Sequence, residues 1–234
     1  MSGHLNPGGQ QFRDDDGAAD PRVHAALAAY HAGQASEQDA LTALAAARLL
    51  VPVVAVLADG STTEGDKNSE MALPTLIGHD GRPAVLAFTG LDTLARWRPS
   101  ARPVPAEADR VWRAAVADGC AVVIDVAGPV PLAVEGARLA ALAAGQAVPP
   151  VYEDGDVRAE VEAAIAAEPM ITGFSLAPSQ QVDLAVRLRL AAANRVGGDW
   201  RPVVNRAAQG IAGRLAVRLR RGVEFSVTRD AVGS

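Results

Sequence analysis

The residues in this chain that are best suited to binding or chemistry lie around Asp125, a carboxylate that follows an apolar run. Val122, Val123 and Ile124 precede it, and Gly128-Pro129 follows it. A polar group at the carboxyl end of a buried strand lies where α/β proteins collect their ligands. One interpretation is therefore a ligand or partner site formed by Asp125, Thr89, Gly128 and Pro129. The alternative, which we favour, is that Asp125 only caps a backbone N–H at the Gly128-Pro129 bend.

Histidines are the next residues that could transfer protons or hold a metal. His79 stands beside Asp80 in a turn, whereas His4, His24 and His31 are remote from it in sequence. A metal site needs three or four convergent ligands, so we predict none here. We also predict no cofactor, because residues 64–69 lack the spacing of a phosphate-binding loop and do not lead into a helix.

Cys120 is the single cysteine of the chain, which excludes an intramolecular disulfide. It stands at the head of an apolar strand, where we expect a buried and unreactive thiol. A nucleophilic cysteine needs a neighbouring base, and none is close in the sequence. We therefore predict no catalytic residues, and a protein without enzymatic activity is the favoured interpretation.

Arginines gather in the C-terminal half, and Arg214, Arg218 and Arg221 recur at the spacing of one helical face. Such a face could bind an acidic protein or RNA. The favoured alternative is a solvated surface whose cations stabilise the end of a helix. Aromatic residues for stacking on bases are limited to Trp200 and Phe225. Together with the net charge of -5, this argues against nucleic acid as the partner.

The bulk composition is that of a globular protein. The chain has 234 residues, of which 49% are hydrophobic and only 4% aromatic, so Ala, Val and Leu must build the core. No run reaches the roughly 18 apolar residues of a membrane helix, and the start lacks the pattern of a secretory signal. We therefore expect a cytoplasmic protein without a membrane partner.

The elements that would position Asp125 lie in a domain predicted over residues 21–145, after a disordered start over residues 1–20. Helices are predicted to begin at Asp20-Pro21 and at Ser36, followed by a strand over 49–57 and a β-hairpin over 70–88. A helix over 91–97, a proline-rich connection over 100–105 and a helix over 106–118 come next. Val122–Ile124 should form a strand buried on both faces, and Leu132, Val134, Leu139 and Leu142 share the spacing of a helix.

A second domain is predicted over residues 157–234, after a linker over residues 146–156 that contains two prolines and a charged turn. Residues 181–190 alternate apolar and polar side chains, which is typical of a half-solvated antiparallel strand. Helices over 157–167 and 200–219 and strands over 170–176 and 223–227 give the order α-β-β-α-β. The fold class is therefore α/β (α+β), with a mixed sheet and flanking helices in the first domain.

Four segments give the chain a resemblance to the SseB family, the "enhanced serine sensitivity" proteins. Residues 46–56 (AARLLVPVVAV) resemble the first helix-to-strand junction of the family. Residues 80–97 (DGRPAVLAFTGLDTLARW) are similar to its central turn, strand and helix, and residues 118–134 (DGCAVVIDVAGPVPLAV) to its strand with a Gly-Pro exit. Residues 157–230 resemble its smaller C-terminal domain. The acidic start and the alanine-rich helices resemble the actinobacterial members.

The resemblance implies an α/β N-terminal domain and a smaller C-terminal one, and it supplies no catalytic residues. The lack of a convergent set of catalytic residues, the patterned core and strand edges that could accept a partner favour a non-catalytic cytoplasmic binding or regulatory module that binds a protein partner. The alternative function is a small-molecule sensor or weak enzyme with a pocket near Asp125. The sequence does not specify the partner or the oligomeric state.

Overall fold

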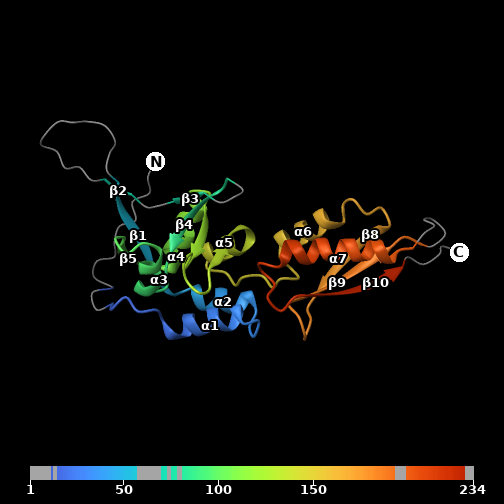
Figure 1. Cartoon of the computed structure of the whole chain (residues 1–234), viewed down its shortest axis with the longest axis horizontal. Coiled ribbons are helices and arrows are strands. Elements are labelled where there is room, and N and C mark those ends of the chain that lie inside the picture. Colours follow the sequence, from blue (N-terminus) through green and yellow to red (C-terminus); the bar gives the residue numbers. More distant parts are fainter. Residues whose placement is uncertain are drawn as a thin grey trace, which may run out of the picture. The chain divides into compact units, whose positions relative to one another are not determined.

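A computed structural model gives the structure of residues 12, 15–56, 70–72, 75–77, 81–192 and 199–229 (Figure 1). The chain divides into two compact units. Unit 1 contains Met1–Ala28 and Leu41–Val148, and unit 2 contains Ala29–Ala40 and Pro149–Ser234. Both units combine helices with β-sheet, so the predicted α+β fold is confirmed.

Two short helices open the described chain, α1 (Pro21–His31) and α2 (Glu37–Leu44). The Asp20 carboxylate accepts a hydrogen bond from the backbone N–H of Arg22 at 2.8 Å, which caps the start of α1 as predicted. At α2, the Ser36 hydroxyl accepts from the Asp39 N–H at 3.2 Å, and the Asp39 carboxylate accepts from the Ser36 N–H at 2.9 Å. This reciprocal pair fixes where α2 begins.

Strand β1 (Arg48–Val56) is the centre of a sheet ordered β2-β1-β5, in which β2 (Glu70–Ala72) and β5 (Arg102–Glu107) both run antiparallel to it. The proline-rich connection predicted over residues 100–105 is therefore wrong for most of its length. Pro103 and Pro105 lie opposite Pro52 and Leu50 in the β1–β5 ladder. Prolines are tolerated there because β5 is an edge strand of this sheet.

A second sheet of unit 1 has the order β3-β4-β6-β7. Its strands are β3 (Thr75–Ile77), β4 (Pro83–Ala87), β6 (Ala121–Ile124) and β7 (Leu132–Val134). Strands β3 and β4 pair antiparallel, which confirms this part of the predicted hairpin, and β4 and β6 pair in parallel. Residues 78–80 at the turn, and the loop predicted over 58–69, lie outside the described residues.

The segment after β6 differs from the prediction. Leu132 and Val134 belong to β7, which pairs antiparallel with β6, and not to a helix. Only α5 (Gly136–Ala143), which carries Leu139 and Leu142, is helical. A spacing of two residues places side chains on one face of a strand, whereas on a helix it would place them on nearly opposite faces. The pairing with β6 agrees with the strand. Strand β6 is also less enclosed than predicted, because Val123 is only half-buried.

Residues 15–20 pack on unit 1, so the predicted disorder over residues 1–20 does not hold for them. Helix α3 (Leu91–Trp97) begins with a hydrogen bond from the Leu91 N–H to the Gly17 carbonyl at 2.9 Å. The Asp15 carboxylate lies 2.8 Å from the guanidinium of Arg48. The predicted helix over 106–118 is α4 (Ala108–Ala117), which ends before Gly119 with its φ of 66°.

Unit 2 contains α6 (Gly155–Ile165), β8 (Ile171–Ala177), β9 (Leu184–Leu190), α7 (Arg201–Leu215) and β10 (Val223–Arg229), in the predicted order. Strand β9 is central, antiparallel to β8 and parallel to β10. Helices α6 and α7 lie side by side and pack their apolar residues against the sheet (Figure 1). The predicted alternation in β9 is confirmed, since Leu188 is fully buried while Arg187 and Arg189 are exposed.

Candidate functional site

Asp125 follows the end of β6 and accepts three hydrogen bonds from the entry to α3. Its Oδ1 accepts from the backbone N–H of Thr89 at 2.9 Å and from the hydroxyl of Thr93 at 2.6 Å. Its Oδ2 accepts from the hydroxyl of Thr89 at 2.6 Å. All three residues are buried, and Asp125 is only 4% exposed. The carboxylate therefore joins the end of one strand to the beginning of α3.

The backbone at Asp125 takes an unusual conformation to reach this position. Its φ is 48°, the only positive φ of a non-glycine residue in the described parts of the chain. Asp is one of the few residues that tolerate this region. The turn is closed by a hydrogen bond from the Gly128 N–H to the Asp125 carbonyl at 2.7 Å. A Cβ on Gly128 would lie 3.0 Å from the Asp125 Cβ, so a side chain there would have to push Asp125 aside by a few tenths of an ångström.

The structure thus brings Thr89, Asp125 and Gly128 together, whereas Pro129 is exposed on the turn. The backbone N–H that the carboxylate caps belongs to Thr89, not to the Gly128-Pro129 bend. Thr93, which the sequence analysis missed, supplies the third donor. With three short bonds on a carboxylate that is 4% exposed, the arrangement is suited to holding the turn, and a ligand would have to open this buried cluster to reach it.

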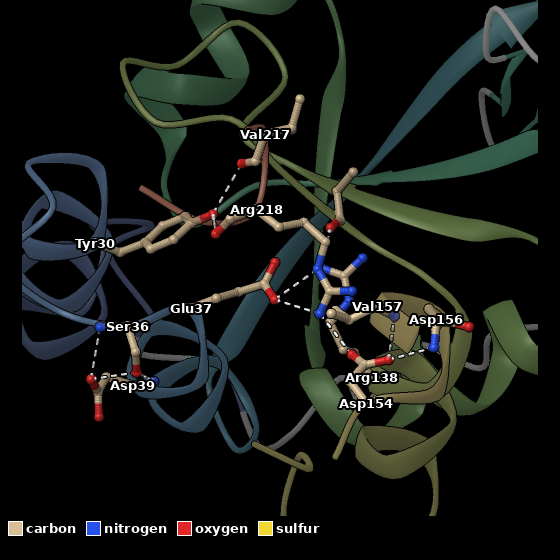
Figure 2. A network of polar contacts seen from close by, with 11 residues as sticks. Tyr30, Ser36, Glu37, Asp39, Arg138, Asp154, Asp156, Val157, Val217 and Arg218 are labelled. Carbon is tan, nitrogen blue, oxygen red and sulfur yellow. Dashed lines mark hydrogen bonds and ion pairs between the residues drawn. The ribbon is translucent and has the colours of Figure 1, made fainter. Parts of the chain in front are cut away.

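A second polar cluster lies within unit 2 around Arg218 (Figure 2). The Arg218 guanidinium donates to Glu37 Oε2 from Nε at 3.1 Å and from Nη2 at 2.9 Å. Nη2 also donates to Asp154 Oδ2 at 2.7 Å. The other oxygen of Asp154 accepts from the Asp156 N–H at 2.8 Å and caps α6. One arginine therefore bridges the start of α2 and the start of α6.

Tyr30 fixes the backbone that carries Arg218. The Tyr30 hydroxyl donates to the carbonyl of Arg218 at 2.9 Å and also lies 3.2 Å from the carbonyl of Val217. The side chain of Asp154 is fully buried, and those of Glu37 and Arg218 are 9% and 16% exposed. Burial disfavours the Arg218 cation, but the carboxylates of Glu37 and Asp154 outweigh it and raise the Arg218 pKa.

This cluster corrects the predicted basic face. Arg218 is mostly buried in an ion-pair network instead of lying on a solvated surface. Arg214 pairs with Glu160 at 2.9 Å, and Arg206 pairs with Glu168 at 2.8 Å. These acidic partners neutralise much of the charge that the spacing of arginines suggested.

Sequence signals for the cluster were present only in part. Asp154 stands three residues before Val157, the first apolar residue of α6, which is the position of an N-cap. No local pattern links Glu37 to Arg218, because 181 residues separate them. Their pairing follows from tertiary structure alone.

The remaining candidates gather into no site. His24 and His31 are exposed, and His4, His79 and residues 64–69 lie outside the described residues. Within the part of the chain that the structure describes, no group of three or more His, Cys, Asp or Glu side chains is placed to hold a metal. Cys120 is half-buried rather than buried, and burial together with the nearby Asp118 raises the pKa of its thiol.

Comparison with known protein families identifies the N-terminal part. The model of the SseB protein N-terminal domain matches residues 23–141, just over half of the chain. The chain belongs to the SseB family. No curated protein and no solved structure matches it.

The SseB match begins in α1 and ends in α5, so it contains Thr89, Asp125 and Gly128. Three of the four segments that carried the resemblance lie inside it, at residues 46–56, 80–97 and 118–134. The fourth, residues 157–230, lies outside, as do Asp154 and Arg218. In the described part of this SseB-family chain, no helix is long and apolar enough to cross a membrane.

Proposed function

We propose that this SseB-family protein is a non-catalytic binding or regulatory module that binds a protein partner in the cytoplasm. The observation that carries the proposal is the outward face of the unit 2 sheet, defined as the side chains of β8, β9 and β10 that point away from α6 and α7. Arg187 is exposed at its centre, between the exposed Ser175 and Ser226. A polar sheet face of this kind offers charge and hydrogen bonds to a partner without a reaction centre.

The hydrogen-bonded groups around Asp125 and Arg218 support a non-catalytic role. Asp125 is engaged by Thr89 and Thr93, and Arg218 by Glu37 and Asp154. A general acid, base or nucleophile must reach a substrate. Carboxylates and cations that are already paired inside the protein stabilise the fold instead.

A small-molecule sensor or weak enzyme with a pocket near Asp125 is the second candidate, and one observation favours it. Backbone strain in folded proteins gathers at ligand sites, and Asp125 has a positive φ. If the protein is such a sensor or enzyme, a ligand would replace the hydroxyl of Thr89 or Thr93 at the Asp125 carboxylate. Release of that strain would then accompany binding.

Two parallel measurements separate these functions. In the first, amino acids, nucleotides and central metabolites are screened for thermal stabilisation of the wild-type chain and of Asp125→Asn. In the second, immobilised protein captures partners from a lysate, and each captured protein is purified and tested for direct binding. A purified partner that binds both forms equally supports the binding module. A metabolite that stabilises the wild type but not Asp125→Asn would refute it and support the sensor.

A further inference from the structure

The outward face of the unit 2 sheet carries its positive charge in two adjacent rows. Arg187 lies opposite Ser175 on β8 and Ser226 on β10. Arg189 lies opposite Gly173 on β8 and Thr228 on β10. Both arginines, both serines and Thr228 are exposed. The rows therefore present guanidinium groups flanked by small residues that do not hide them.

Arg187 is available to a partner. No carboxylate of the described residues forms an ion pair with it, in contrast to Arg206 and Arg214 on α7. It projects from the central strand of its sheet, whose opposite side is packed against α6 and α7. Pairing of β9 with a strand on each side fixes the backbone of Arg187, so its side chain projects from a rigid position.

Gly173 leaves room for the side chain of Arg189 on the sheet. A Cβ built on Gly173 would come within 2.3 Å of Arg189 Nη2, so the guanidinium lies close above the glycine. Only a residue without a side chain leaves room for this placement. The guanidinium therefore lies near the surface of the sheet, in the row next to that of Arg187.

The spacing of the two arginines matches an extended polypeptide. They are two residues apart on one strand, so their Cα atoms are separated by about 6.6 Å. Alternate side chains of another extended chain have the same separation. Guanidinium groups pair with carboxylates through charge-assisted and often bidentate hydrogen bonds. An extended segment with acidic residues at every second position can thus meet both arginines.

We propose that the outward face binds an extended acidic segment of a protein partner, with Arg187 and Arg189 pairing with carboxylates at alternate positions. This inference rests on the proposed function and names the chemistry of the partner. No described residue of the outward face is aromatic, so the face lacks the stacking platforms that single-stranded nucleic acids use. Glu224, one row beyond Arg187, disfavours acidic residues at that end and orients the segment.

The test uses the full chain and synthetic peptides followed by fluorescence anisotropy. One peptide carries glutamate at every second position, and a second peptide of the same composition carries its glutamates in one block. We expect the alternating peptide to bind more tightly. Exposed ion pairs contribute about 0.2–1 kcal/mol, so Arg187→Gln and Arg189→Gln should each weaken its binding by up to about fivefold. The double variant should lose on the order of tenfold or more.

Arg206→Gln and Arg214→Gln are the matched controls, because they remove an exposed arginine of unit 2 from the opposite side of the sheet. Binding should be unchanged in both. Equal losses in all four variants, or equal binding of both peptides, would mean unspecific attraction and would overturn the proposal. Tighter binding of a single-stranded RNA that is lost in Arg187→Gln would overturn it in favour of nucleic acid.

The same variants separate this inference from the proposed function. If a purified partner binds the wild type and the Arg187→Gln/Arg189→Gln variant equally, the binding module stands and the outward face is not its surface. If a metabolite proves to be the ligand through Asp125, the proposed function falls together with this inference. A partner that loses its binding only in the double variant supports both.

Discussion

The Arg218 guanidinium donates to the Asp154 carboxylate at 2.7 Å, although 64 residues separate the two in the chain. The same carboxylate caps α6 through the Asp156 N–H. One buried acid therefore sets both where a helix begins and where a distant arginine lies. Because Arg218 also binds Glu37, its removal would leave two largely buried carboxylates without their cation.

Replacing Arg218 should therefore destabilise the protein far more than replacing an exposed arginine. We expect Arg218→Met to lower the free energy of unfolding by about 3 kcal/mol, because breaking a buried pair leaves its partner charged and unpaired. Arg214→Met, which removes an exposed pair with Glu160, should cost less than about 1 kcal/mol. Urea unfolding followed by circular dichroism measures both. Equal losses would show that the Arg218 network contributes little.

Asp125 should tolerate asparagine but not alanine. The amide oxygen of Asn can accept from the Thr89 N–H and Thr93 hydroxyl, its NH₂ can donate to the Thr89 hydroxyl, and Asn also accepts a positive φ. We expect Asp125→Asn to cost less than about 1 kcal/mol. Asp125→Ala loses the bonds to a charged group and should cost about 3 kcal/mol. Thermal and urea unfolding measure the difference, and a mild Asp125→Ala would argue against the described hydrogen bonds.

Two substitutions of glycine by alanine should change the stability of the protein in opposite directions. Gly128→Ala places a Cβ 3.0 Å from the backbone carbonyl of Asp125 and should destabilise by about 1–3 kcal/mol. Gly213→Ala lies in α7, where a Cβ meets nothing within 4 Å, and should stabilise by about 0.5–1 kcal/mol. Melting temperatures of the two variants test the pair. A stabilising Gly128→Ala would contradict the tight turn.

The charged carboxylate of Asp183 should destabilise the folded protein, and protonation of Asp183 should remove this penalty. Burial raises its pKa, although the backbone N–H of Arg221 donates to Oδ2 and partly offsets this. A carboxyl whose pKa is raised on folding destabilises the folded state above that pKa. This penalty is relieved as the pH falls through the folded pKa toward the unfolded value of about 3.9. The urea midpoint of Asp183→Asn should therefore exceed that of the wild type at neutral pH, and this difference should shrink as the pH falls. A difference between the two midpoints that grows on acidification would contradict the raised pKa of Asp183.

Cys120 should react slowly with thiol reagents at neutral pH. Burial and the nearby Asp118 raise the pKa of its thiol, so less thiolate is present than in a free cysteine. Alkylation by iodoacetamide, followed by mass spectrometry, should be slower than that of a cysteine peptide and should accelerate on raising the pH. Asp118→Asn should speed the reaction modestly, because it removes the second cause. A rate equal to that of the peptide would contradict the raised pKa.

The sequence by itself determined the features that depend on neighbouring residues. Asp20 and Ser36 satisfy the first free N–H groups of their helices, so local hydrogen bonding alone marks those starts. The period-two alternation of residues 181–190 fixed which side of β9 is buried, because a strand turns successive side chains to opposite faces. The association of Thr89 with Asp125 also followed from the expectation that polar groups gather beyond the carboxyl ends of strands.

Tertiary structure decided the rest, because pairing partners far apart in sequence leave no local pattern. The spacing of Leu132 and Val134 is that of a strand, but only their antiparallel pairing with β6 shows which sheet they join. Pro103 and Pro105 look like a connection until β1 makes their segment an edge strand. The spacing of Arg218 suggests a solvated face, yet Glu37 and Asp154 converge on it and bury it. Burial and ion pairing depend on distances in space, which the order of residues does not contain.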